Sequence, residues 1–112
     1  MPTRACLVLL LVFLLPLART AAEEDPIAVH KAIAALQPLA RRPDATSEIL
    51  TLLGEAMLMA DRVADAERTL QQALMRQPVA AVAYRHLAEI ARRRGRPDVA
   101  REAEERYRRL SG

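Results

Sequence analysis

Residues in this chain of 112 recur at a spacing of thirty-four. Offsetting the sequence by thirty-four aligns three alanines and four further pairs: Ala32 with Ala66 and Ala100, Leu36 with Leu70, Leu53 with Leu87, Glu55 with Glu89, and Arg62 with Arg96. The matches fall at helix-periodic positions, which chance similarity between alanine-rich segments would not require. A period of this length is typical of a repeat array, in which one supersecondary unit stacks on the next.

The composition indicates that the repeated unit is helical. Aromatic residues make up only 3% of the chain, and the core must be built from Ala, Leu, Val, Ile and Met, which favours helix over sheet. We expect an all-α protein with helices at roughly 46–60, 63–76, 80–94 and 97–110, preceded by a half-repeat helix over 26–42. Pro38 should kink or end that first helix. Gly95 suits a left-handed cap, and Pro97 suits the first turn of the last helix.

Small residues stand where two helices of a pair would cross. Gly54, Ala66, Ala88 and Ala100 would allow close approach, because a bulky side chain would hold the backbones apart. The last helix has one apolar stripe, Val99, Ala103, Tyr107 and Leu110, and is otherwise charged. We expect it to cap the array with a polar outer face, and Glu104 replaces an apolar residue there.

The repeat resembles the tetratricopeptide repeat (TPR), whose pattern runs W-x2-L-G-x2-Y, then A-x3-F, then P. In the first copy the matching residues are Leu50, Leu53-Gly54, Met57, Ala66, Leu70 and Pro78. In the second copy they are Tyr84, Leu87-Ala88, Ala91 and Ala100. The resemblance implies repeats at about 47–80 and 81–112 within a domain over 23–112. It also implies about two and a half helical hairpins forming a short right-handed α-solenoid.

The family resemblance further implies peptide binding on the concave surface lined by the first helix of each repeat. By position, the site residues would be Glu48, Thr51, Glu55, Arg85, Glu89 and Arg92, and the same surface would include Leu58, Met59, Val82 and Arg93. We expect Arg85 and Arg92 to face the groove, with Glu55 and Glu89 limiting which anions enter. The chain contains no Asn, so a partner of mixed charge fits better than a C-terminal carboxylate held by Lys and Asn.

The first twenty-two residues match the pattern of a signal peptide. Arg4 precedes an apolar run over residues 5–15, and small residues at 20–22 come before an acidic start of the mature region. The run is shorter than the roughly 20 residues that span a bilayer, so we expect cleavage after Ala22. The alternative is an uncleaved signal anchor. The only cysteine, Cys6, would be lost on cleavage.

Charge does not point to nucleic acid. Cleavage would remove Arg4 and Arg19 and lower the formal net charge from +3 to about +1, and there are few aromatic platforms for bases. The basic run Arg92-Arg93-Arg94-Gly95-Arg96 could attract an acidic peptide or anionic lipid heads. Alternatively, these cations favour the carboxyl end of their helix.

No catalytic or cofactor-binding motif is present, so we expect no enzyme activity, no cofactor and no metal site. The two histidines, His30 and His86, lack a histidine partner at helical spacing. We expect both on the surface, with His86 beside Glu89.

Together these patterns predict an exported protein–protein interaction module, an adaptor or assembly factor of the bacterial periplasm or cell envelope. Its partner would be a protein or peptide and not nucleic acid. Two alternatives stay open: a small homo-oligomerising structural unit, and a membrane-anchored adaptor that keeps its signal segment.

Overall fold

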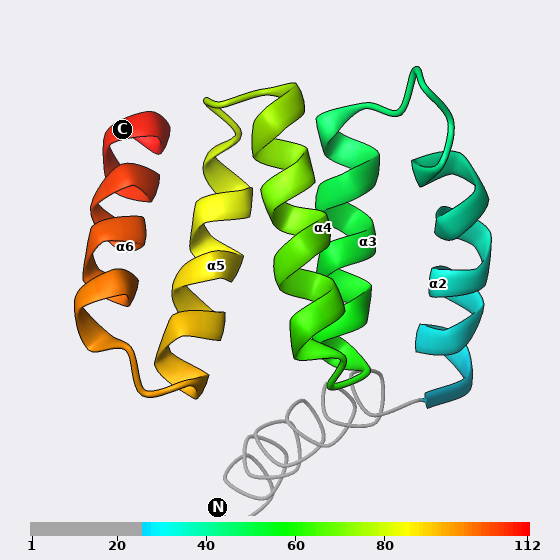
Figure 1. Cartoon of the computed structure of the whole chain (residues 1–112), viewed down its shortest axis with the longest axis horizontal. Coiled ribbons are helices and arrows are strands. Elements are labelled where there is room, and N and C mark those ends of the chain that lie inside the picture. The colour runs from blue at the N-terminus through cyan, green and yellow to red at the C-terminus, as the bar shows by residue number, and fades with distance from the viewer. Residues whose placement is uncertain (1–25) are drawn as a thin grey trace, which may run out of the picture.

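The computed structural model describes residues 26–112, and within this range the protein is all helical, as predicted. The five helices of residues 26–112 follow one another along the molecule in chain order (Figure 1). They are α2 (Pro26–Ala40), α3 (Ser47–Met59), α4 (Val63–Arg76), α5 (Ala81–Arg93) and α6 (Pro97–Ser111). Every predicted helix is present, with ends within two residues of the expected ones. The predicted signal segment, 1–22, lies outside the described residues.

The turn between helices recurs at the thirty-four-residue spacing. Asp61 after α3 and Gly95 after α5 both have left-handed backbones, with φ of 60° and 67°. The next residue closes each turn: the N–H of Arg62 donates to the carbonyl of Met57, and the N–H of Arg96 to that of Ala91, both at 2.8 Å. This is the hydrogen-bonding pattern of a helix ending in a left-handed residue. The predicted cap at Gly95 is confirmed, and Pro97 begins α6.

Small residues set how closely paired helices approach. Ala66 and Ala88 are fully buried, and Ala100 is nearly so. At Gly54, an added Cβ atom would lie 2.7 Å from Cγ of Leu70, which is itself fully buried. Helices α3 and α4 therefore pack at a separation that a larger residue at 54 would not permit. The predicted role of the small residues is confirmed.

Helix α2 packs on α3 and buries Val29 and Ile33 in the same core. Contrary to one of the two expectations, Pro38 does not end this helix, which continues to Ala40. A proline lacks an N–H and its ring crowds the preceding turn, but the chain beyond Pro38 still forms helical hydrogen bonds: the N–H of Arg41 donates to the carbonyl of Gln37 at 3.2 Å. Among residues 26–112, no helix is long and apolar enough to cross a membrane.

Candidate functional site: the groove between α3 and α5

A groove of about 450 Å³ runs between α3 and the start of α5, with the α4–α5 loop along one side. It brings together three of the six residues predicted for binding, Glu48, Thr51 and Glu55, all on α3. The complete lining is Ser47, Glu48, Thr51, Leu52, Glu55, Gln77, Ala80, Ala81 and Val82. The predicted residues Arg85, Glu89 and Arg92 do not line it.

Helical spacing explains why α3 presents these side chains. Leu50, Leu53 and Met57 form the buried face of the helix. The outward stripe at i, i+4, i+7 and i+11 is Glu48, Leu52, Glu55 and Met59. Leu52 is 53% exposed, and Val82 across the groove is 43% exposed. The groove therefore alternates carboxylates with accessible apolar side chains.

Thr51 belongs to the groove but does not offer a free hydroxyl proton. Its Oγ1 atom donates to the carbonyl of Ser47 at 2.8 Å, and the residue is buried. The threonine thus forms part of the floor of the groove. Leu58, expected on the same surface, is buried in the core, whereas Met59 is exposed.

The carboxylates of the groove lack basic partners. Within residues 26–112, Glu48 forms no ion pair, and the only ionisable partner of Glu55 is the imidazole of His86 at 3.8 Å. Glu89 differs, because Arg93 pairs with it at 2.9 Å on the same helix. Negative charge is therefore uncompensated by Lys or Arg at Glu48 and Glu55.

His86 is not on the surface, and that prediction is wrong. The residue is only 7% exposed, and its Nε2 atom has no hydrogen-bond partner among the described residues. Burial lowers the pKa of His86, which the Arg85 charge also favours, whereas Glu55 and Glu89 act in the opposite direction. The imidazole is accordingly neutral at pH 7 and leaves the charge of Glu55 uncancelled.

The error has a physical reason. The spacing along α5 relates His86 only to Glu89, whereas the carboxylate nearest to its ring, Glu55, belongs to α3. Contacts between separate helices are not encoded in the spacing along one of them. His30, in contrast, is exposed, and its Nδ1 atom lies 2.5 Å from the carbonyl of Pro26.

Arg85 and Arg92 turn toward α6. The guanidinium of Arg85 lies over the ring of Tyr107, 5.9 Å from its centre, and Arg92 forms an ion pair with Glu104. Thirty-four residues earlier, Leu58 and Leu70 stand where Arg92 and Glu104 stand here, and both leucines are buried. In the terminal repeat, charged residues thus replace apolar ones at these positions.

The rest of the basic run is also tied to other elements. Arg93 pairs with Glu89 and lies 3.8 Å from Asp61, while Arg94 pairs with Glu67 on α4. Arg96 makes no ion pair with any described residue. Most of the positive charge of the run is therefore compensated within the fold, which weakens the reading of the run as an anion site.

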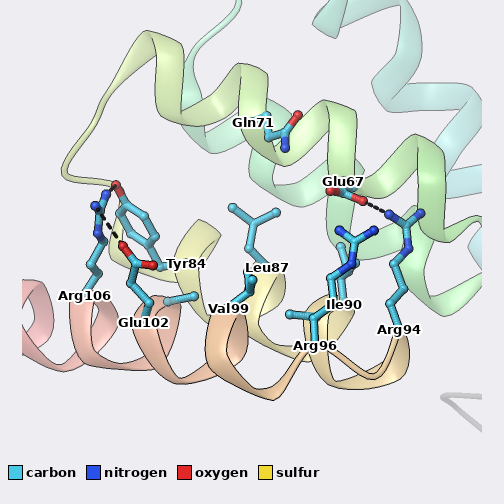
Figure 2. A pocket seen from close by; sticks show the side chains of 12 residues that line it. Glu67, Gln71, Tyr84, Leu87, Ile90, Arg94, Arg96, Val99, Glu102 and Arg106 are labelled. Carbon is cyan, nitrogen blue, oxygen red and sulfur yellow. Dashed lines mark hydrogen bonds and ion pairs between the residues drawn. The ribbon is translucent and has the colours of Figure 1, made fainter.

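A second groove, of about 240 Å³, lies over α5 between α4 and α6 (Figure 2). Leu87, Ile90 and Val99 contribute its apolar surface. Val99, predicted for the apolar stripe of α6, is exposed in this groove.

The polar groups of the second groove largely bind one another. Glu67 pairs with Arg94, and Arg106 pairs with Glu102 and donates to the hydroxyl of Tyr84 at 3.4 Å (Figure 2). Glu67 stands thirty-four residues after the buried Ile33, and Arg94 thirty-four after Ala60. At the junction of α4 and α5, an ion pair thus replaces the two apolar residues that stand thirty-four positions earlier. Such self-paired groups offer less to a ligand than the unpaired carboxylates between α3 and α5.

Within the described part of the chain, no three His, Cys, Asp or Glu side chains are placed to hold a metal ion. Comparisons with models of protein families, with curated proteins and with solved structures find no match for this chain.

Proposed function

We propose that this chain is an exported TPR-type interaction module that binds a partner protein or peptide in the groove between α3 and α5. The five helices would form a short right-handed α-solenoid of about two and a half repeats. The repeated sequence pattern supports this architecture, and so does the left-handed turn that recurs at Asp61 and Gly95. The module would serve as an adaptor or assembly factor.

The observation that carries the proposal is the chemistry of one face. Glu48 and Glu55 carry charge without a Lys or Arg partner among the described residues, and accessible Leu52 and Val82 lie beside them. Accessible apolar side chains rimmed by polar residues are typical of protein interaction sites. The second groove has no unpaired carboxylate, because Glu67 pairs with Arg94 and Glu102 with Arg106, and Arg96 is its one charged side chain without an ion pair.

Export is proposed from the sequence of residues 1–22, whose basic start, short apolar run and small closing residues match a cleaved signal peptide. The proposed location is the periplasm or an equivalent envelope space. Mass spectrometry of the exported protein would test this: a mature N-terminus near Glu23 is expected. An intact segment would instead favour the membrane-anchored adaptor.

Photo-crosslinking in the producing cell tests the binding face. A benzophenone side chain is introduced at Leu52, inside the groove, and in a control at Met75, which is highly exposed on α4. We expect a discrete adduct with another protein from position 52 and little from position 75. Adducts of twice the chain mass would favour the homo-oligomerising alternative. Equal, diffuse labelling from both positions would contradict the proposed binding face.

A further inference from the structure

The stripe of α3 that faces the groove has a definite charge pattern. Its two carboxylates, Glu48 and Glu55, are seven residues apart, which places them about 10.5 Å apart along the helix. Leu52 lies between them, and Val82 of α5 lies on the other side of the groove. The surface therefore offers two negative charges with an apolar contact in the middle.

Helix stability alone does not explain both carboxylates. Glu48 is in the first turn of α3, where a negative charge favours the helix dipole. Glu55 is in the middle of the helix, its side chain is 45% exposed, and no Lys or Arg of the described residues pairs with it. Most other side-chain carboxylates of residues 26–112 do have such partners, including Asp65 with Arg62 and Glu89 with Arg93, and Glu105 on α6 is the exception.

We propose that the groove takes a cationic and apolar segment of the partner, with Lys or Arg side chains against Glu48 and Glu55 and an apolar side chain between Leu52 and Val82. This inference rests on the proposed function, since it names the chemistry of the partner at the same site. A helix with basic residues at i and i+7 and an apolar residue at i+3 or i+4 has the matching spacing.

The surroundings of the groove agree with a cationic occupant. The groups that face His86 are Glu55 from α3 and Glu89 and Arg85 from α5. A neutral imidazole does not compensate the charge of Glu55. Protonated His86 would compete with the partner's cation for that carboxylate, so binding should weaken in acid. Arg85 and Arg92 are directed toward α6 and do not line the groove.

The test uses the purified, ¹⁵N-labelled chain and two synthetic peptides of about 15 residues. One peptide is an amphipathic helix of Leu and Lys, and the matched peptide replaces every Lys with Glu. We expect the Lys peptide to shift the amide signals of Thr51, Leu52 and Val82. Added salt should weaken the binding of this peptide. The Glu peptide should leave these signals unchanged.

Two charge-matched variants make the test specific. The variant E48Q/E55Q should bind the Lys peptide with an affinity lower by about tenfold or more, because both proposed contacts lose their charge. E102Q/E105Q removes the same charge from exposed positions of α6 and should bind like the unmodified chain. Circular dichroism verifies that both variants are folded.

The proposal is overturned if the Lys peptide shifts residues of α6 instead, shifts none, or binds E48Q/E55Q as well as the control. Binding of the Glu peptide at Leu52 would also overturn the cationic occupant while leaving the proposed binding face intact. Failure of that face is detected separately, by the crosslinking comparison of positions 52 and 75.

Discussion

The Nε2 atom of His86 on α5 lies 3.8 Å from the Oε2 atom of Glu55 on α3, and no described group forms a hydrogen bond with it. This contact joins α3 and α5, and Glu55 also lines the groove between them. Leaving a buried polar atom without a partner costs stability, about 1–3 kcal/mol. Protonation of His86 would therefore change both the stability of the fold and the charge beside Glu55.

Acid should reduce stability through His86. Burial lowers the pKa of His86 in the folded chain, so as the pH falls below about 6.5 the unfolded chain takes up a proton that the folded chain does not. The free energy of unfolding therefore decreases until the pH has passed the folded pKa.

Urea unfolding between about pH 7.5 and pH 5 measures this dependence. His86→Leu is the natural control, because Leu52 occupies the equivalent place in the first repeat. The variant should show a flatter dependence in this range. If its pH dependence equals that of the unmodified chain, His86 is not the titrating group.

Reversing the charge of Arg85 and Arg92 should weaken the contact of α5 with α6 and leave the groove unaltered. The variant R85E/R92E loses the ion pair with Glu104 and the contact with Tyr107, at a cost of about 1 kcal/mol. Thermal melts should show this loss, and affinity for a cationic peptide should be unchanged or slightly higher. Abolished binding with an unaltered melting temperature would mean that the arginines face the partner, as expected from the sequence.

The ion pair of Glu67 and Arg94 should be replaceable by the residues found thirty-four positions earlier, Ile33 and Ala60. Their side chains are 24% and 32% exposed, so removing Arg94 alone leaves a partly buried carboxylate unpaired. We expect R94A to destabilise by about 0.5–1 kcal/mol. The double variant E67I/R94A, which reproduces Ile33 and Ala60, should recover or exceed the original stability in urea unfolding. A double variant less stable than R94A would show that the two junctions do not pack alike.

Replacing alanine by leucine should destabilise the fold at a buried position and have little effect at an exposed one. Ala66 has no accessible surface, and Ala66→Leu should destabilise the chain by about 1–3 kcal/mol. Ala34 is exposed on α2, and Ala34→Leu makes the same change in volume with an expected effect within about 0.5 kcal/mol. Equal melting temperatures for the two variants would contradict the close packing of α3 and α4.

The helices and their turns could be predicted from the sequence because they depend on local periodicity and on a repeat. The left-handed cap at Gly95 is an example, since glycine is the residue best suited to that backbone. Aligning the sequence at the thirty-four-residue spacing also places the charged Glu67 opposite the buried Ile33 and so indicates a polar substitution at the junction of α4 and α5. The spacing alone does not identify Arg94 as the partner of Glu67.

The arrangement of the groove could be predicted only in part. The three α3 residues are the positions that the resemblance to the tetratricopeptide repeat implies, and the groove contains them. The direction of Arg85 and Arg92 was not predictable, because a long side chain at the edge of a helix can reach either neighbour. Burial of His86 depends on how α3 and α5 are rotated against each other, which spacing along one helix does not determine.

Crosslinking from Leu52 in the E48Q/E55Q background tests the binding face and its charge together. The benzophenone at position 52 is compared in three versions of the chain: the unmodified background, E48Q/E55Q, and the control E102Q/E105Q. We predict that the partner adduct falls by about fivefold or more in E48Q/E55Q and is unchanged in the control. An adduct of equal yield in all three would contradict an acidic groove that binds the partner.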